Sequence, residues 1–262
     1  MDNSKNLIIG LSVGVYSAVQ HVESFILSLR KYYDGQVCMI IDEKSEPMVD
    51  FLKKHNVDIS LVKSKLTPES VMFNRWVLPR KVLIEKYKDV ENVILPDTRD
   101  LIFQDNPFDF LSGKPLDLSV ETKLVKECLA YNKPWVLNLY GEEVYDQIKN
   151  NWILCAGVTG GKRKAIIELC DVMVEEYIKF GTSFVDQCTL NVFYSQRKLP
   201  EAELHFTGEK LVATIGHSFG NTKLDSEGYL IGNNGIRPAM VHQYDRHKDV
   251  QHFFVENAIK PL

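Results

Sequence analysis

Apolar runs and helix-like patterns alternate along the first hundred residues of the chain. Strands are predicted over residues 6–14, 35–42, 57–64 and 92–96, and the first, second and fourth of these contain runs of apolar residues typical of strands buried on both faces. Between them, apolar residues recur at the spacing of one helix face, over residues 18–33, 46–56 and 74–90. This alternation predicts an α/β sandwich around a central, mostly parallel sheet. Ligands of such sheets bind at the carboxyl ends of the strands.

The second half of the sequence is patterned less evenly. Residues 101–150 show no sustained period, and residues 151–161 predict a strand that runs into a glycine-rich turn. Two amphipathic helices are expected over residues 162–180 and 183–196, followed by short strands and loops from residue 198 to residue 262. No linker, repeat or low-complexity block interrupts the chain, so we expect a single domain over residues 1–262.

Composition and charge exclude several classes of protein. The chain has 262 residues, of which 45% are hydrophobic and 25% charged, and its formal net charge of -4 gives no basic field for nucleic acid. Its five cysteines are far apart and form no CxxC pair, which predicts reduced, buried thiols and neither a disulfide framework nor a zinc site. We find no signal peptide and no transmembrane segment, and we expect a soluble, cytoplasmic protein.

Two carboxylates follow the fourth predicted strand, in the stretch VILPDTRD. Asp97 and Asp100 lie where a parallel sheet presents its ligands, and carboxylate oxygens bind hard divalent ions such as Mg²⁺ or Mn²⁺. A plain loop, in which Asp97 caps a turn and Asp100 pairs with Arg99, is the alternative. His242 also follows a short apolar run, and a neutral imidazole can join carboxylates on a metal, although a solvated polar turn explains it equally well.

Other candidates each have a structural alternative. Arg75 and Arg80 offer forked guanidinium groups to a diphosphate, or they form salt bridges with Glu85 or Asp89. Asp186 begins a predicted helix, where an acid serves catalysis or complements the helix dipole. His205 and His217 are assigned structural roles.

The glycines of CAGVTGG allow close approach of a ligand to the backbone, or they simply form a tight turn. The chain contains neither the G-x-G-x-x-G spacing after its first strand nor a P-loop sequence. Neither of these two nucleotide-binding motifs is therefore expected.

Taken together, VILPDTRD, CAGVTGG, DQCTLN and VHQYDR occur in an order that resembles glycosyltransferases of the GT-A fold. The resemblance spans nearly the whole chain and is strongest to a group found in bacterial surface-polysaccharide systems and large DNA viruses, through DTRDLIFQDNPF and VHQYDR. It implies a Rossmann-like α/β/α sandwich with a nucleotide-binding half to about residue 110 and an acceptor-side half over about 111–262.

The resemblance also implies an activity and a site. A divalent metal, Mn²⁺ or Mg²⁺, would be held by Asp97, Asp100 and His242, and the enzyme would move a sugar from a nucleoside-diphosphate sugar to a hydroxyl of a glycan or glycoconjugate. Asp186 and Gln187 are the implied catalytic residues, with Asp186 as the base if the reaction inverts. The implied nucleotide-sugar contacts are Val13, Gly14, Tyr16, Asp42, Arg75, Arg80, Asp97, Gly157, Gly160 and Gly161. The usual motif is Asp-x-Asp, whereas this chain has Asp-x-x-Asp, so the division between ribose and metal contacts stays open.

Two other functions are compatible with the same fold. A sugar nucleotidyltransferase shares the acids, the metal and the nucleotide, but it carries a basic glycine-rich loop after the first strand, and GLSVGVYSAVQ contains no Lys or Arg. The second alternative is a non-catalytic, sugar-binding relative of the same fold.

Overall fold

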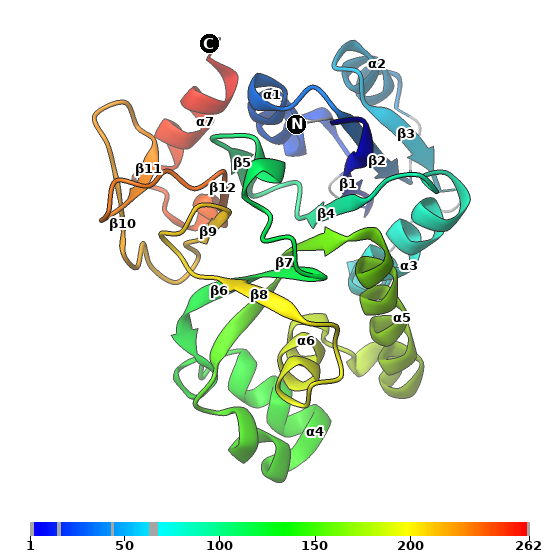
Figure 1. Cartoon of the computed structure of the whole chain (residues 1–262), viewed down its shortest axis with the longest axis vertical. Helices are drawn as coiled ribbons and strands as arrows, with labels where there is room; N and C mark the ends of the chain where they lie inside the picture. The colour runs from blue at the N-terminus through cyan, green and yellow to red at the C-terminus, as the bar shows by residue number, and fades with distance from the viewer. Residues whose placement is uncertain (1–2, 15–16, 43–44, 63–67, 261–262) are drawn as a thin grey trace.

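The computed structural model describes residues 3–14, 17–42, 45–62 and 68–260. Its centre is a seven-stranded sheet in the order β3-β2-β1-β4-β7-β6-β8 (Figure 1). Four of the six strand pairings are parallel, and only the two pairings of β7 are antiparallel. The strands are β1 (Asn6–Ser12), β2 (Gln36–Ile41), β3 (Asp58–Leu61), β4 (Asn92–Pro96), β6 (Leu116–Leu124), β7 (Trp152–Lys162) and β8 (Ala202–His205).

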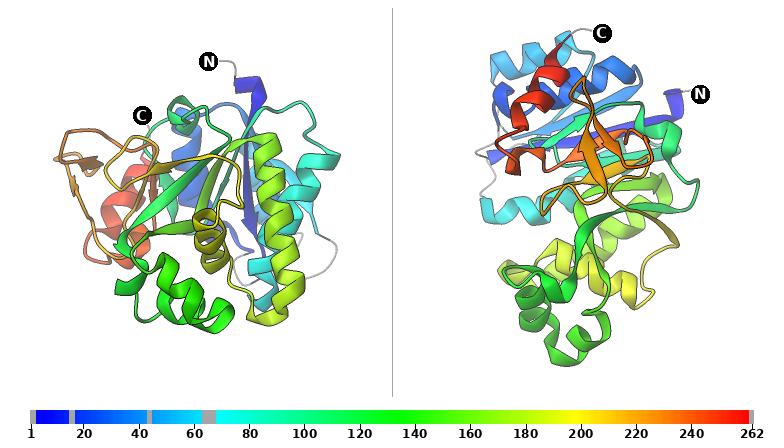
Figure 2. Two further views of the ribbon diagram at one scale, coloured as in Figure 1. Left: turned by 60° about the horizontal axis from the view of Figure 1, so that its bottom comes forward. Right: turned by 90° about the vertical axis from the view of Figure 1, so that its left-hand side faces the viewer.

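Helices cover both faces of this sheet, so the predicted α/β architecture with a mostly parallel sheet is confirmed (Figures 1 and 2). Alternate residues of β1 show the two layers: Leu7 and Ile9 pack in the core under α3 and α5, and Ile8 packs under α1 and α2. Two further helices, α4 and α6, pack together beyond β7. The helices are α1 (Glu23–Tyr32), α2 (Glu46–Lys54), α3 (Pro68–Glu85), α4 (Asn132–Ile148), α5 (Arg163–Phe180) and α6 (Asp186–Ser195).

A small sheet beside the main one joins distant parts of the chain. Its three strands lie in the order β5-β12-β9, with β5 at Leu101–Phe103, β12 at Met240–His242 and β9 at Val212–Thr214. A two-stranded ribbon of β10 (Thr222–Leu224) and β11 (Leu230–Gly232) and helix α7 (Gln251–Ile259) complete this region. Short 3₁₀ turns lie at Asn3–Lys5, Val19–His21, Pro107–Phe110, Val125–Glu127, Gly181–Ser183 and Tyr244–Arg246.

Four helices and strands were not expected from the pattern, and the first of them is the three-residue strand β5. Strand β6 carries polar residues at buried positions, so its apolar run is broken. Helix α4 contains Pro134 and is kinked at Gly141, whose φ is +82°, so no single helical period runs through it. Helix α7 lies in the part expected to hold only strands and loops.

The predicted glycine-rich turn is wrong. Gly160 and Gly161 lie inside β7, which continues to Lys162 and pairs there with β4 on one side and β6 on the other. The strand continues because these glycines let the neighbouring chains approach closely. A Cβ on Gly161 would lie 2.9 Å from Cα of Leu116.

All five cysteines are buried free thiols, as predicted. Within the described residues, none of the helices combines the length and the apolar character needed to cross a membrane.

Candidate functional site

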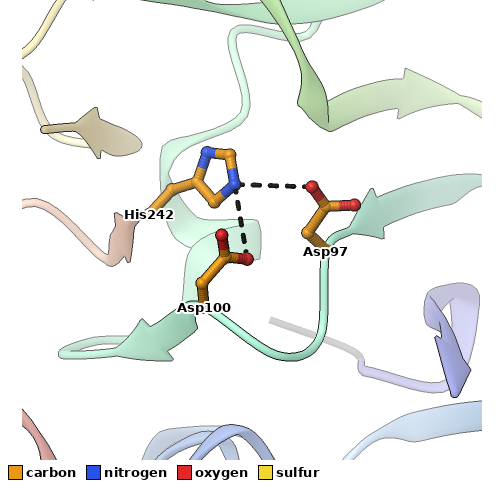
Figure 3. Close-up of side chains that lie close together, drawn as sticks. All are labelled: Asp97, Asp100 and His242. Atoms are coloured by element: carbon orange, nitrogen blue, oxygen red, sulfur yellow. Dashed lines mark ion pairs between the residues drawn. The ribbon is translucent and has the colours of Figure 1, made fainter. Parts of the chain in front are cut away.

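Asp97, Asp100 and His242 meet at one point of the structure (Figure 3). Nε2 of His242 lies 3.5 Å from Oδ2 of Asp97 and 3.8 Å from Oδ1 of Asp100. In an octahedral Mg²⁺ site with bonds of about 2.1 Å, adjacent ligand atoms lie about 3 Å apart and opposite ones about 4.2 Å apart. The two distances in the structure lie between these values.

Strand ends bring these three residues together. Asp97 directly follows β4, and its backbone N–H donates to the carbonyl of Gly157 on β7 over 2.6 Å. The chain then turns back at Asp100 into β5, whose first residue pairs with His242 on β12. The backbone N–H of Gln243 donates to the carbonyl of Asp100 over 2.7 Å, so the two sides of the site are joined directly.

Gly157 leaves the space that the ligand side chains occupy. A Cβ at this position would lie 2.7 Å from both Oδ2 of Asp97 and Nε2 of His242, and closer still to the ring carbon Cε1. Carbon atoms in contact are normally about 3.5–4.0 Å apart. The absence of a side chain at Gly157 is therefore a condition for this cluster to form.

His242 is fully buried, yet Nε2 has no hydrogen-bond partner among the described residues. Its other ring nitrogen, Nδ1, lies 3.6 Å from Sγ of Cys155. A buried polar atom without a partner costs free energy. A cation held between Nε2 and the two carboxylates would remove that cost.

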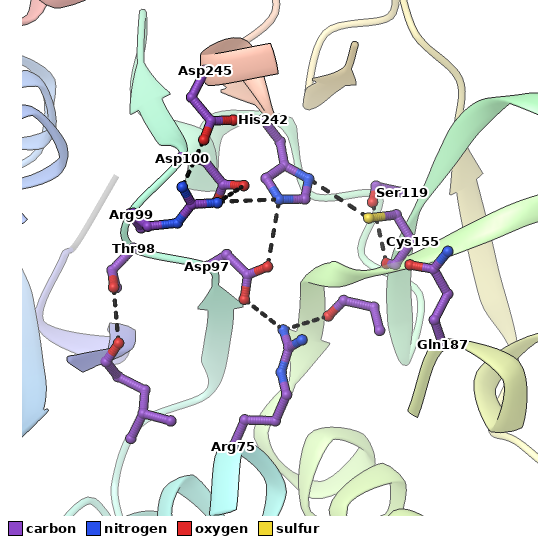
Figure 4. Close-up of polar contacts among 12 residues, drawn as sticks. Arg75, Asp97, Thr98, Arg99, Asp100, Ser119, Cys155, Gln187, His242 and Asp245 are labelled. Carbon is purple, nitrogen blue, oxygen red and sulfur yellow. Dashed lines mark hydrogen bonds and ion pairs between the residues drawn. The ribbon is translucent and has the colours of Figure 1, made fainter. Parts of the chain in front are cut away.

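Charged side chains surround the three ligands in a connected network (Figure 4). Arg75 contacts Oδ1 of Asp97 at 2.9 Å and Oδ2 of Asp186 at 3.1 Å, and Arg99 bridges Asp100 and Asp245. Two guanidinium groups and the imidazole of His242 thus face four carboxylates. This excess of carboxylates favours a cation at the centre of the network.

The pKa directions agree with that charge balance. Burial by itself would raise the pKa of Asp97, but Arg75 and then His242 outweigh it and hold that pKa at about 2. Burial raises the pKa of Asp100. For His242, burial opposes charging, yet Cys155, and after it Asp97 and Asp100, hold its pKa well above the usual value. The position of Nε2 thus attracts positive charge.

A hollow of about 260 Å³ opens next to the three ligands, at the carboxyl ends of β1 and β4. Its lining includes Leu11, Arg75, Asp97, Arg99 and Asp100. At the same edge of the sheet, the backbone N–H of Gly14, which has a φ of +62°, donates to Oδ2 of Asp42 over 2.8 Å, and Val13 is buried. Val13, Gly14 and Asp42 therefore lie at this edge of the sheet, whereas the expectation for Tyr16 falls outside the described residues.

Three residues expected in the nucleotide-sugar site are not brought to it. Arg80 pairs with Asp171 of α5, because five positions along α3 turn it about 140° away from Arg75. Gly160 and Gly161 pair with Ile94 and Val93, near the other end of β4, about 10 Å along the strand from Gly157. Their role is the close packing of β7 described above.

The two residues expected to be catalytic lie close to the cluster but are engaged differently. Asp186 is buried, its Oδ2 accepts from Arg75, and its Oδ1 accepts from the backbone N–H of Gln187. Burial raises the pKa of Asp186, and Arg75 opposes that rise. Through these contacts Asp186 holds Arg75 in place. Gln187 instead donates from Nε2 to Oε1 of Glu121 over 3.1 Å.

Two residues near Gln187, Glu121 and Asn132, were missed by the sequence reasoning, and His217, which lies beside them, was assigned a structural role. Glu121 lies on β6 and is only 5% exposed, and its Oε2 lies 3.0 Å from Nε2 of His217. A signal for Glu121 was present, because polar residues at positions 117, 119 and 121 repeat with the period of one strand face. His217 and Asn132 carry no comparable signal in the sequence.

No model of a known protein family matches the sequence, and the search of curated proteins likewise finds no match. Function is therefore inferred from the side chains and their arrangement.

Proposed function

We propose that the protein is a metal-dependent glycosyltransferase of the GT-A fold, which transfers a sugar from a nucleoside-diphosphate sugar to a hydroxyl of a glycan or glycoconjugate. One observation carries the proposal: buried His242 turns Nε2, which makes no hydrogen bond to the described residues, toward two carboxylates at the carboxyl edge of the parallel strands. The adjoining hollow, with Asp42 and Gly14 at the same edge, offers room for the nucleotide.

The donor set fits Mn²⁺ or Mg²⁺. Two carboxylate oxygens and one imidazole leave positions for water and phosphate oxygens, which is the way these ions bind nucleotides. Cys155, the nearest thiol, faces Nδ1 and not the carboxylates. When bound, the ion would stabilise negative charge on the diphosphate that leaves the sugar.

The chain's own residues orient the donor and balance charge. Arg75 holds Asp97 in one orientation through its contacts with Asp97, Asp186 and the carbonyl of Ala156. Arg99 lines the hollow, where it bridges Asp100 and Asp245 and places positive charge beside the position proposed for the diphosphate. Gly157 keeps the backbone of β7 close to the reacting centre.

The substitution Asp100→Asn tests the proposal, because it keeps the size of the side chain and removes its charge. We expect Mn²⁺ binding, measured by calorimetry, and Mn²⁺-dependent release of nucleoside diphosphate from a panel of UDP- and GDP-sugars to be lost together. Mn²⁺ at a hundred times its dissociation constant stabilises a protein by about 2.7 kcal/mol, so the wild type, and not the variant, should melt at a higher temperature with the ion.

Asp171→Asn is the matched control, since Asp171 also pairs with an arginine but lies outside the site. It should bind Mn²⁺ like the wild type. If Asp100→Asn keeps both metal binding and turnover, the metal assignment is wrong. Release of pyrophosphate from a nucleoside triphosphate would instead indicate a nucleotidyltransferase, and sugar binding that is indifferent to Mn²⁺ and to Asp100→Asn would indicate a non-catalytic module.

A further inference from the structure

A second hollow of about 390 Å³ opens between α4, β6 and the segment that follows β9. Pockets for small molecules typically measure about 300–1,000 Å³. Its lining includes Glu121, Asn132, Trp135, Gln187, His217 and Gln243. None of these residues is a ligand of the proposed metal.

This hollow is a direct neighbour of the metal-ligand group. Gln187 follows Asp186 in the chain, and Gln243 follows His242. Glu121 acts electrostatically on Cys155, which in turn lies against His242. A molecule in the hollow would therefore lie beside a donor sugar held at the metal.

Gln243, which lines the hollow, has an unusual backbone conformation and a buried side-chain oxygen. Its side-chain oxygen is buried and has no hydrogen-bond partner among the described residues. Its backbone has a φ of +63°, a left-handed conformation that costs about 1–3 kcal/mol in a residue other than glycine. The bond from its N–H to the carbonyl of Asp100 holds that conformation.

Aromatic and amide groups give the hollow the character of a sugar site. The half-buried ring of Trp135 lies next to exposed Tyr131, with the two ring centroids 5.4 Å apart. Flat apolar rings pack against the C–H faces of a sugar, and amides such as those of Asn132 and Gln187 bond its hydroxyls.

Glu121 and His217 supply a base at the same place. Oε2 of Glu121 lies 3.0 Å from Nε2 of His217, at ion-pair distance. In the neutral imidazole, a hydrogen on Nε2 avoids repulsion between two lone pairs, and Nδ1 then keeps a lone pair. Within the described part of the chain, Nδ1 has no hydrogen-bond partner. A carboxylate that fixes the tautomer of a histidine is a common way to prepare a general base.

We propose that this hollow binds the acceptor sugar of the proposed glycosyltransferase and that His217 is its general base; the inference rests on the proposed function. The acceptor hydroxyl gives its proton to Nδ1 of His217, and its oxygen forms the new bond to C1 of the donor sugar. The bond from C1 to the diphosphate oxygen breaks, and its electron pair leaves with the nucleoside diphosphate. Glu121 is a positioning residue that stabilises the imidazolium.

His217→Gln tests the proposal, with release of nucleoside diphosphate as the readout and water or a panel of methyl hexosides as acceptors. A general base contributes about 10²–10⁴-fold to a rate, so we expect release to fall at least about 100-fold. Binding of UDP with Mg²⁺, followed by thermal shift, should be unchanged. Added imidazole, which binds Mg²⁺ poorly, should restore part of the rate of His217→Ala. It would not do so if His217 had only a structural role.

His205→Gln is the matched control, because His205 pairs at 2.7 Å with Asp117, another buried carboxylate of β6, outside this hollow. Its rate should stay near that of the wild type. The proposal is overturned if His217→Gln keeps its rate, or if its rate falls only in step with its binding of UDP and Mg²⁺. A wild-type protein that releases no nucleoside diphosphate and binds no UDP with Mg²⁺ would refute the proposed function itself.

Discussion

Gly157→Ala should abolish metal binding while leaving the fold in place. The new Cβ would lie 2.7 Å from Oδ2 of Asp97 and from Nε2 of His242. Because contacts at such atoms are normally about 3.5 Å or longer, both side chains must move by roughly 1 Å. Metal–ligand distances tolerate only about 0.2 Å.

The expected magnitudes follow from that displacement. Overpacking a filled site costs about 1–3 kcal/mol in the free energy of unfolding, which lowers Tm by roughly 2–12 °C in a chain of this size. Loss of two of three ligands should weaken Mn²⁺ binding at least about 100-fold, or about 2.7 kcal/mol. Calorimetric titration with Mn²⁺ and thermal unfolding measure the two effects separately.

Gly160→Ala, in the same strand, is the control. A Cβ there would lie 3.2 Å from the flexible end of Leu111 and 3.5 Å from Ile94, so a small shift accommodates it. We expect wild-type Mn²⁺ affinity and a change of less than about 1 kcal/mol in the free energy of unfolding. Mn²⁺ affinity in Gly157→Ala equal to that of the wild type would show that Asp97 and His242 do not hold the ion.

Two further changes address the groups that orient the ligands. Arg75→Lys replaces the guanidinium group that contacts Asp97, Asp186 and a backbone carbonyl with a single ammonium. Urea unfolding should therefore show that the free energy of unfolding falls by about 1–3 kcal/mol. An unchanged midpoint would show that Arg75 does not bridge these groups. Cys155→Val removes the sulfur 3.6 Å from Nδ1 of His242 and should weaken Mn²⁺ binding about 10–100-fold, whereas Cys155→Ser, which keeps a polar atom, should bind within about threefold of the wild type. Equal affinities in both cysteine variants would show that the thiol does not orient the imidazole.

The apolar periods were sufficient to predict the strands and helices of the first half, because β1, β2 and β4 are buried on both faces and α1 and α2 each have one apolar face. They failed at β6, where the buried side chains of Ser119 and Glu121 form hydrogen bonds with polar groups of Cys155 and Gln187. They also failed at α4, where Gly141 breaks the helix and resets its period.

The site was predictable only where a strand end marked it. Asp97 and Asp100 follow a clear strand, and His242 follows a short one, so their positions could be read from the sequence. His217 lies in an irregular segment, and its partner Glu121 becomes a neighbour only through the folding of β6. Arg75 and Arg80 look alike in the sequence, and only the helix rotation separates them.

The pairing of β5 with β12 gives an ion at this site a mechanical effect on the molecule. Leu101 and His242 are direct partners in that ladder. Asp100 and His242 therefore lie at two neighbouring strands that are far apart in the sequence. An ion bound by both residues would link β5 to β12 and stabilise their pairing. Amide hydrogen exchange at positions 101–103 and 240–242 should then slow when Mn²⁺ is added, and fraying of β12 would release the ion before the seven-stranded sheet loosens.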